Sequence, residues 1–288
     1  MKPAPFQMLR PRTVAEAVAL LASAGDDAKI MAGGQSLGPM LNLRLATPGV
    51  IVDISGIAEL KTAREEADHI TYGALVTHAD VEDGRVPDVG TNIMRRVAGG
   101  IAYRAVRNRG TMGGSLSHAD PAADWVNALS VLGADIEIAG PNGRRTLSLA
   151  AFLTSALTTA LEPGELLVAV KVSKVPEHMR FGYAKHCRKV GEFAHAVGAL
   201  LVDPATGHGR ALIGALDAPP LVFADASILF ATRSSGELAM RFDADAANAA
   251  LTRFGLTDEV DRHIHVEVLR RAVKQVSSLP LPETRSAA

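Results

Sequence analysis

The sequence predicts an α+β protein in which a region of alternating helices and strands is followed by a separate C-terminal α+β domain. Three observations support this prediction. Helical and strand-like segments alternate along the first part of the chain, three strand-like runs follow one another after residue 180, and two helical stretches come last. Alternation is typical of α/β packing, whereas grouped strands followed by helices indicate an α+β domain.

The first helix has the clearest local signal. Thr13 and Glu16 form a capping box, in which an N-cap hydroxyl is followed three residues later by a carboxylate. Apolar residues recur at helical spacing from Val14 to Leu21, and the helix is expected to end near Gly25. Three elements follow: a strand at 29–32, a turn that opens into a short helical stretch within 33–45, and a buried strand at 50–54.

The remaining elements fall on either side of a boundary at 174–177. Before it we expect a strand at 69–75, a helix within 89–102 that breaks at Gly99-Gly100, a helix from Pro121 to about Leu132, a hairpin at 135–149 and a strand at 165–172. After it we expect strands at 181–190, 194–203 and 209–216 and helices at 246–254 and 265–276. The predicted division is 1–57 and 58–174 as two subdomains, 175–280 as a C-terminal domain with a three-stranded sheet and helices, and 281–288 as a tail.

Charge and hydropathy disfavour several classes of partner. The net charge is −1 and no run of five or six like charges occurs, which disfavours nucleic acid or an anionic membrane as the main partner. No apolar run approaches the roughly 18–20 residues of a membrane span. The N-terminal sequence lacks the apolar core of a signal peptide. We therefore expect a cytoplasmic protein.

Cysteine and histidine usage limits the possible chemistry. Cys187 is the single cysteine, so the chain can form no internal disulfide and cannot supply the several thiolates that an iron–sulfur cluster needs. A small buried thiol is the simplest interpretation of Cys187. The nine histidines show no metal-binding spacing, and no nucleophile–base pair is recognisable. The sequence therefore nominates no catalytic residue and no metal ligand.

Two glycine-containing segments are the main functional signal. We call Ala32–Leu37 (AGGQSL) the first glycine segment and Thr111–Ser115 (TMGGS) the second. Paired glycines let the main chain approach a ligand closely, and the N–H groups that follow can bind an anion. Gln35 and Ser36 add side-chain donors to the first segment, as the hydroxyls of the second segment do there. We therefore expect this main chain to bind a diphosphate, although an isolated Gly-Gly also fits a plain tight turn.

Two carboxylates follow the second glycine segment. Asp120 is suited to cap a helix with Pro121 at its first position. Asp124 would be repelled by a diphosphate and is expected to face neutral hydroxyls, such as those of a ribose or ribityl chain. The alternatives are a helix cap alone for Asp120 and a dipole-favoured surface carboxylate for Asp124. The P-loop and Rossmann motifs are both absent.

Four stretches together resemble a known family. They are PFQMLRPRTVAEAVALL, AGGQSLGPMLNLRLATPGVIVDI, RNRGTMGGSLSHADPAAD and YAKHCRKVGEFA. The chain resembles, essentially from end to end, the FAD-binding medium subunit of the molybdenum hydroxylases. The resemblance implies a fold of the vanillyl-alcohol oxidase type, in which two FAD-binding subdomains (1–57 and 58–174) hold the cofactor and the C-terminal domain closes over them.

The resemblance also implies which residues contact FAD. They are Met31, Ala32, Gly33, Gly34, Gln35, Ser36, Leu37, Ile101, Ala102, Gly110, Thr111, Gly113, Gly114, Ser115, Ala119, Asp120, Asp124, Leu167, Lys185 and Phe193. The two glycine segments would hold the pyrophosphate, and Asp124 would contact ribityl or ribose hydroxyls. Phe193 stands where relatives often have a tyrosine covering a flavin face. A core position for Phe193 and a solvent-facing charge for Lys185 are the alternatives.

The implied function is electron transfer without substrate hydroxylation. FAD would receive electrons from two [2Fe–2S] clusters in a small partner subunit and pass them to an external acceptor. Substrate would react at a molybdenum cofactor in a large partner subunit, and the expected assembly is a dimer of heterotrimers. The alternatives are a stand-alone flavin-dependent oxidoreductase of the same fold and an assembly subunit that has lost FAD.

Overall fold

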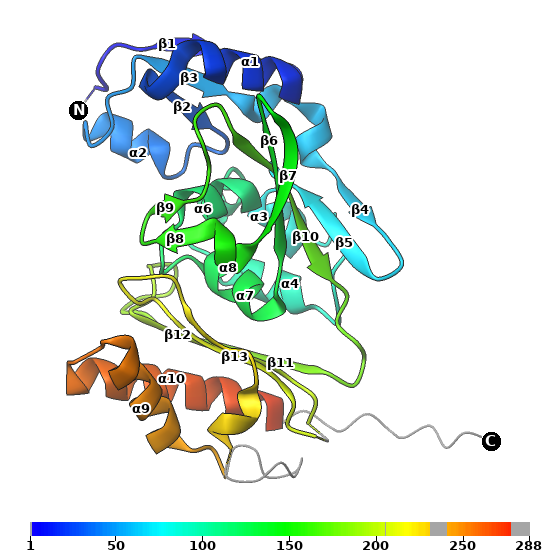
Figure 1. Cartoon of the computed structure of the whole chain (residues 1–288), viewed down its shortest axis with the longest axis vertical. Helices are drawn as coiled ribbons and strands as arrows, with labels where there is room; N and C mark the ends of the chain where they lie inside the picture. Colours follow the sequence, from blue (N-terminus) through cyan, green and yellow to red (C-terminus); the bar gives the residue numbers. More distant parts are fainter. Residues whose placement is uncertain (1, 205, 231–240, 278–288) are drawn as a thin grey trace. The chain divides into compact units, whose positions relative to one another are not determined.

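The computed structural model describes residues 2–204, 206–230 and 241–277, and these form two compact units (Figure 1). The first unit extends to Asp120 and includes Gly133–Lys174. The second comprises Pro121–Leu132 and the described residues from Val175 onward. One border between the units coincides with the boundary expected after residue 174. The helix-forming segment 121–132, which the sequence places in the second subdomain, belongs to the second unit.

The first unit begins with a small parallel sheet of order β1-β3-β2. Its strands are β1 (Gln7–Leu9), β3 (Val50–Asp53) and β2 (Ala28–Met31). Helix α1 (Val14–Ala24) starts as expected, because the Thr13 hydroxyl accepts a hydrogen bond from the Glu16 N–H. The Glu16 carboxylate accepts in turn from the N–H of Arg12, one residue before the cap. Strand β1, which is only three residues long, is not predicted from the sequence.

A five-stranded antiparallel sheet completes the strand framework of this unit, together with a two-stranded ribbon. The sheet has the order β4-β5-β10-β6-β7, and its strands are β4 (Ala63–Glu65), β5 (His69–Gly73), β10 (Leu166–Ser173), β6 (Asp135–Gly140) and β7 (Gly143–Ser148). The ribbon pairs β8 (Leu153–Ser155) with β9 (Thr158–Thr159). The expected hairpin is β6–β7, where Gly140 pairs with Gly143 across the turn.

One hydrophobic core joins the regions that the sequence assigns to separate subdomains. Val14 and Leu21 of α1 pack in a buried cluster with Val52 of β3 and with Leu166 and Val168 of β10. Because α1 contributes to the packing of both β3 and β6, residues 1–57 and 58–174 share this core. The elements that carry the two glycine segments therefore belong to one packed unit.

Short helices connect the strands of the first unit. They are α2 (Leu37–Asn42), α3 (His78–Glu82), α4 (Ile93–Gly99), α5 (Arg104–Arg107), α6 (Met112–His118) and α8 (Leu149–Phe152). The helix expected within 89–102 is thus confined to α4. Helix α6 is not predicted from the sequence, because Gly113 and Gly114 in its first turn are poor helix formers.

The second unit is a four-stranded antiparallel sheet with helices on both faces (Figure 1). Its elements are β11 (Arg180–His186), β12 (Ala196–Val202), β13 (Gly209–Gly214), β14 (Leu221–Phe223), α7 (Asp124–Leu132), α9 (Ala244–Phe254) and α10 (Glu259–Ser277). The α+β class is confirmed, but the expected three-stranded sheet has a fourth, three-residue strand. The expected tail, 281–288, lies outside the described residues.

Helix α7 starts three residues later than the sequence suggests. Pro121 lies in a turn, so Asp120 does not cap α7 in the way expected. The buried Asn127 side chain holds this turn instead, because its Nδ2 donates to the carbonyls of Pro121 and Ala123 at 2.9 Å each. Asp124 is therefore the first residue of α7. Across the described ranges, none of the helices has the length and apolar character needed to cross a bilayer.

Candidate functional site

The two glycine segments lie side by side in the first unit, as the sequence analysis expects. A Cβ on Gly33 would lie 1.9 Å from the carbonyl oxygen of Arg109, the second residue before Thr111. A Cβ on Gly114 would lie 3.6 Å from the Cβ of Ala32. Gly33 is thus required by the close approach of the two chain segments to each other.

The first glycine segment presents main-chain donors for which the described residues provide no acceptor. Within the described ranges, the N–H groups of Gly34, Gln35, Ser36 and Leu37 have no hydrogen-bond acceptor. The carbonyl of Gly33 accepts from Gln35 Nε2 and from Arg109 Nε, each at 3.3 Å. The Gly33 C=O and the Gly34 N–H belong to one trans peptide and point in opposite directions. The Gly34 N–H therefore points away from the Gln35 and Arg109 side chains.

The second glycine segment differs, because the N–H groups of its last four residues are bonded within the protein. Those of Met112 and Gly113 donate to the carbonyls of Val76 and Ala74, and those of Gly114 and Ser115 donate to the Thr111 side chain and carbonyl. The expectation that both segments offer free N–H groups is therefore wrong for the second. What remains there is chiefly the hydroxyl protons of Thr111 and Ser115.

Glycines near the second segment serve internal packing. A Cβ on Gly113 would lie 2.6 Å from the Cβ of Ala74, and one on Gly110 would lie 2.6 Å from Nε2 of His78. The Gly110 carbonyl also accepts from the His78 N–H at 3.0 Å. His78, which is buried at the start of α3, therefore supports the chain directly before Thr111.

We expect the support from His78 to make the protein sensitive to acid. Burial, helped by the nearby Arg107 guanidinium, lowers the pKa of His78 from 6.5 to about 4. The folded protein then binds fewer protons than the unfolded chain between these values, so stability is full above pH 6.5 and falls as pH drops toward 4. The loss should reach roughly 3 kcal/mol.

Denaturant unfolding of the apoprotein at pH 7, 6, 5 and 4 would measure this loss. The variant His78→Asn should show a shallower decline, whereas His263→Asn, at an exposed position of α10, should follow the wild type. An unchanged decline in His78→Asn would show that other groups cause the acid sensitivity.

Ile101 and Ala102, two further residues expected to contact FAD, are held in place by hydrogen bonds to their main-chain carbonyls. Arg107 donates through Nη1 to the carbonyls of Ile101 and Ala102, while a bidentate pair with Glu82 holds its guanidinium. Ala102 adopts a positive φ of 41° in this arrangement. The arginine thus directs both carbonyls toward itself, and the Ile101 and Ala102 side chains remain partly exposed.

Three other residues expected to contact FAD differ in their exposure: Ala119, Asp120 and Leu167. Ala119 is buried with a positive φ of 52°, and its carbonyl accepts from the N–H of Leu157 at 2.9 Å. Asp120 follows it and is partly exposed. Leu167 lies within β10 and is only 3% exposed, so its side chain belongs to the core.

The second unit brings together Asp124 and Lys185, which are 61 positions apart. The Lys185 ammonium lies 2.9 Å and 3.0 Å from the two oxygens of the Asp124 carboxylate, and the Tyr183 hydroxyl donates to Oδ1 at 2.9 Å. The Asp124 and Lys185 side chains are 10% and 18% exposed. Neither the surface carboxylate nor the solvent-facing lysine considered from the sequence is therefore found.

Burial governs the protonation of this cluster. It raises the pKa of Asp124, and the Lys185 ammonium and the Tyr183 hydroxyl oppose that shift. Burial also raises the pKa of Tyr183 well above 10, helped by the neighbouring carboxylate. The phenol therefore stays protonated and donates its hydrogen bond at physiological pH.

Phe193 lies in the loop between β11 and β12 and is 63% exposed. The alternative of a core residue is therefore wrong. Val190 in the same loop is also largely exposed. An exposed aromatic ring on this loop is available to a ligand or a partner.

Three residues that shape these sites were not expected from the sequence. Tyr183 precedes Lys185 by two positions on one strand, and that spacing places both on the same face. Arg109 lies inside the quoted motif RNRG, yet no pattern showed that it contacts Gly33. Asn127 gave no signal, because its role depends on the turn before α7.

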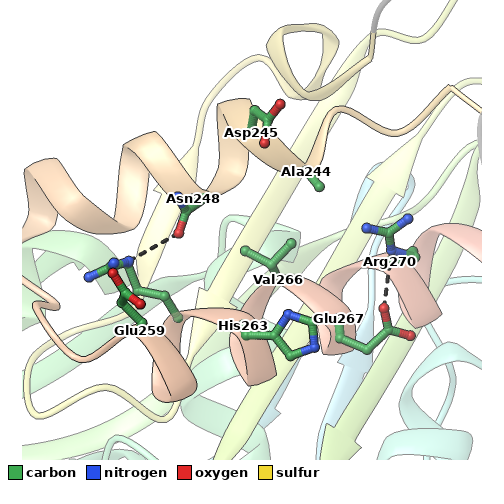
Figure 2. A pocket seen from close by; sticks show the side chains of 9 residues that line it. Ala244, Asp245, Asn248, Glu259, His263, Val266, Glu267 and Arg270 are labelled. Carbon is green, nitrogen blue, oxygen red and sulfur yellow. Dashed lines mark hydrogen bonds and ion pairs between the residues drawn. The ribbon is translucent and has the colours of Figure 1, made fainter.

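The second unit also contains a separate cavity of about 330 Å³ between α9 and α10, shown in Figure 2. It is lined by Ala244, Asp245, Asn248, Glu259, Arg262, His263, Val266, Glu267 and Arg270. Arg262 Nε donates to Asn248, and Arg270 pairs with Glu267 (Figure 2). None of the expected FAD-contacting residues lines this cavity, so we regard it as a feature of helix packing.

Comparison with known proteins supports one family. A family model described as the FAD binding domain in molybdopterin dehydrogenase matches residues 4–175. The chain is 37% identical to the carbon monoxide dehydrogenase medium chain of Afipia carboxidovorans, over 72% of each chain. It is 38% identical to the 6-hydroxypseudooxynicotine dehydrogenase complex subunit alpha of Paenarthrobacter nicotinovorans, over 70% of this chain and 68% of the relative.

A solved structure extends the similarity to nearly the whole chain. The reconstituted CO dehydrogenase from Oligotropha carboxidovorans contains a chain that superposes with a TM-score of 0.86 at 30% identity. The match covers 96% of this chain and 99% of that one. The two glycine segments lie inside the matched FAD-binding domain, and the fold agrees along both units. The chain therefore belongs to the FAD-binding medium subunits of the molybdenum hydroxylase family.

Proposed function

We propose that this chain holds FAD by its first glycine segment and transfers electrons within a molybdenum-containing hydroxylase or dehydrogenase. Electrons would come from [2Fe–2S] clusters of a partner subunit and leave to an external acceptor. Family membership makes the chain an FAD-dependent oxidoreductase subunit. The observation that carries the assignment of the site is the run of four free main-chain N–H groups from Gly34 to Leu37.

The residues present fit the chemistry of FAD. Successive main-chain N–H groups form an anion-binding concavity, which suits the pyrophosphate. The Thr111 hydroxyl accepts from Gly114 and keeps its own proton for a phosphate oxygen. The Asp124 carboxylate is held by two donor groups, the Tyr183 hydroxyl and the Lys185 ammonium, and a carboxylate held in this way can also accept from a ligand hydroxyl.

Each part of the chain then has a limited task. FAD supplies the redox chemistry when bound, and the protein positions it and sets its surroundings. The first glycine segment anchors the pyrophosphate, while the hydroxyls of Thr111 and Ser115 complete the anion site. Asp124, fixed by Lys185 and Tyr183, orients a hydroxyl. The exposed ring of Phe193 covers a flavin face, which limits access of water and acceptors to it.

The proposed partners are a large subunit with the molybdenum cofactor and a small subunit with the [2Fe–2S] clusters, assembled in the cytoplasm as a dimer of heterotrimers. Two relatives support this division of labour, because one is named a medium chain and the other a subunit of a dehydrogenase complex. With Cys187 as its one cysteine, this chain cannot supply the thiolates of a cluster.

Ser36→Asp tests the assignment of the first glycine segment. Ser36 is the N-cap residue of α2, a position that tolerates aspartate as well as serine. The Ser36→Asp apoprotein should therefore unfold at the same denaturant concentration as the wild type or at a slightly higher one. The added charge should repel the pyrophosphate and raise the FAD dissociation constant by at least about 100-fold. Flavin-fluorescence titration of the apoprotein would measure this change.

Ser36→Ala is the matched control and should weaken FAD binding by no more than about tenfold, because it removes one neutral donor. Wild-type affinity in Ser36→Asp would exclude the first glycine segment as the pyrophosphate site. Expression of the chain with and without its partners tests the wider role. Substrate turnover by the flavin-loaded chain alone would favour a stand-alone oxidoreductase.

A further inference from the structure

We propose that Asn127 is a positioning residue for FAD: it holds the turn before α7 and so sets the direction in which the Asp124 carboxylate meets a ligand hydroxyl. The proposal rests on the function proposed above, in which Asp124 orients such a hydroxyl. Asn127 is completely buried, so it acts through the start of α7 and does not touch the ligand itself.

The sequence around this turn favours a longer helix than the one that forms. Asp120 suits an N-cap and Pro121 suits the first helical position, yet α7 begins at Asp124. Nδ2 of Asn127 donates to the carbonyls of Pro121 and Ala123 at 2.9 Å each, and these bonds hold a turn in place of the extra helical residues. Asp124 thereby becomes the first residue of α7, three positions before Asn127 and on the same face of the helix.

The main chain does not need the Asn127 side chain to satisfy its hydrogen bonds. The Pro121 carbonyl also accepts from the N–H of Ala215 at 3.2 Å, and the Ala123 carbonyl also accepts from the N–H of Asn127 at 3.3 Å. Oδ1 of Asn127, in contrast, is buried without a donor among the residues that the structure describes. An unpaired buried acceptor costs as much free energy as one or two neutral hydrogen bonds contribute. Stability alone therefore does not account for an asparagine at this position.

The neighbouring strand is adapted to this side chain. A Cβ on Gly214, the last residue of β13, would lie 1.6 Å from Oδ1 of Asn127. The next residue, Ala215, has a positive φ of 60°, and its N–H donates to the Pro121 carbonyl. A glycine in a strand and a left-handed alanine both lower stability. Because these unfavourable features meet at one turn, we infer that the position of the turn has a functional purpose.

That purpose is the placement of the Asp124 carboxylate. Lys185 and Tyr183 bind it from β11, whereas Asn127 packs against Gly214 of β13. The first turn of α7 is therefore anchored at two strands of the sheet. A helix anchored on both sides cannot rotate about its axis, so the carboxylate oxygens keep one direction toward a ligand hydroxyl.

Coupling between Asn127 and Asp124 tests this role. We would titrate the full-length apoprotein with FAD and follow flavin fluorescence. Asn127→Ala should raise the FAD dissociation constant roughly tenfold, because the hydrogen bond from the ligand hydroxyl to the charged carboxylate is then misaligned. In the background Asp124→Leu/Lys185→Met, which lacks the carboxylate, Asn127→Ala should cause no further loss. Equal losses in both backgrounds would mean that Asn127 acts independently of Asp124, and the proposal would be overturned.

A second pair of variants separates positioning from support of the fold. Gly214→Ala should lower the denaturant midpoint of the apoprotein, because its Cβ collides with Oδ1 of Asn127. Asn127→Ala/Gly214→Ala removes the collision and fills part of the space left by the amide, so most of the midpoint should be regained. FAD affinity should nevertheless stay as weak as in Asn127→Ala. If affinity returns to the wild-type value together with stability, Asn127 only supports the fold.

Ser130→Ala is the matched control on the same helix. The Ser130 hydroxyl donates to the Val126 carbonyl at 2.7 Å within α7, so its removal should leave FAD affinity unchanged. If Asp124→Leu/Lys185→Met binds FAD weakly while Asn127→Ala binds it like the wild type, Asp124 keeps its role and only the inference fails. If both variants bind FAD like the wild type, the hydroxyl contact of Asp124 in the proposed function is wrong, and the inference fails with it.

Discussion

Lys185→Met is expected to destabilise the apoprotein by roughly 3–5 kcal/mol, because it leaves the buried Asp124 carboxylate without its cation. The loss should be largest at neutral pH and smaller in acid. Burial already raises the Asp124 pKa, and removal of the ammonium raises it further. A group whose pKa is higher in the folded state favours folding at low pH, and this contribution is lost as pH rises through the folded value.

The double variant Asp124→Leu/Lys185→Met is the matched control. It removes both charges, and buried ion pairs are often replaced by apolar residues without loss of stability, so most of the destabilisation should disappear. Denaturant unfolding of the wild type, both single variants and the double variant completes the cycle. Additive effects of the single variants would show that the two charges do not depend on each other.

Gly33→Ala is expected to have the second large effect, because its Cβ would lie 1.9 Å from the Arg109 carbonyl oxygen. A main-chain carbonyl cannot move aside as a flexible side chain can, so the two glycine segments must separate. We expect a loss of about 3 kcal/mol in stability, near the upper end for overpacked sites. The FAD dissociation constant should rise roughly 100-fold, since the free N–H groups follow directly after Gly33.

Gly38→Ala provides the comparison within the same stretch of chain. A Cβ at Gly38 would meet no atom within 4 Å, and the residue lies inside α2, where alanine is the better helix former. The apoprotein should be equally stable or more stable by about 0.5–1 kcal/mol, with unchanged FAD affinity. Equal effects of Gly33→Ala and Gly38→Ala would contradict the argument from close approach.

The sequence predicts correctly those elements whose structure depends on residues close to one another in the chain. The Thr13 cap of α1 and the β6–β7 hairpin could be expected from residue types and spacing, whereas the approach of the two glycine segments was implied by the family resemblance. The family resemblance added the fold, which the comparison with solved structures supports.

Tertiary partners decided what the sequence could not show. The N–H groups of Met112 and Gly113 are occupied because Val76 and Ala74 lie beside them, and no pattern within 111–115 reveals that. Likewise, Lys185 could be assigned to solvent or to a ligand until its ion pair with Asp124 was seen. Glycine content predicts close approach, but the structure shows whether a ligand or another chain segment approaches.

The path of the chain through α7 limits how this protein can be divided and how it is made. The ribosome releases α7 well before β12 and β13, the strands against which it packs. Until those strands emerge, the buried face of α7 around Trp125 and Leu129 has no completed partner sheet. A recombinant fragment that ends where the family match ends, at residue 175, would lack β12 and β13, so the apolar face of α7 would stay exposed to solvent. We therefore do not expect the matched FAD-binding region to fold as an independent domain that could be fused to or exchanged between enzymes.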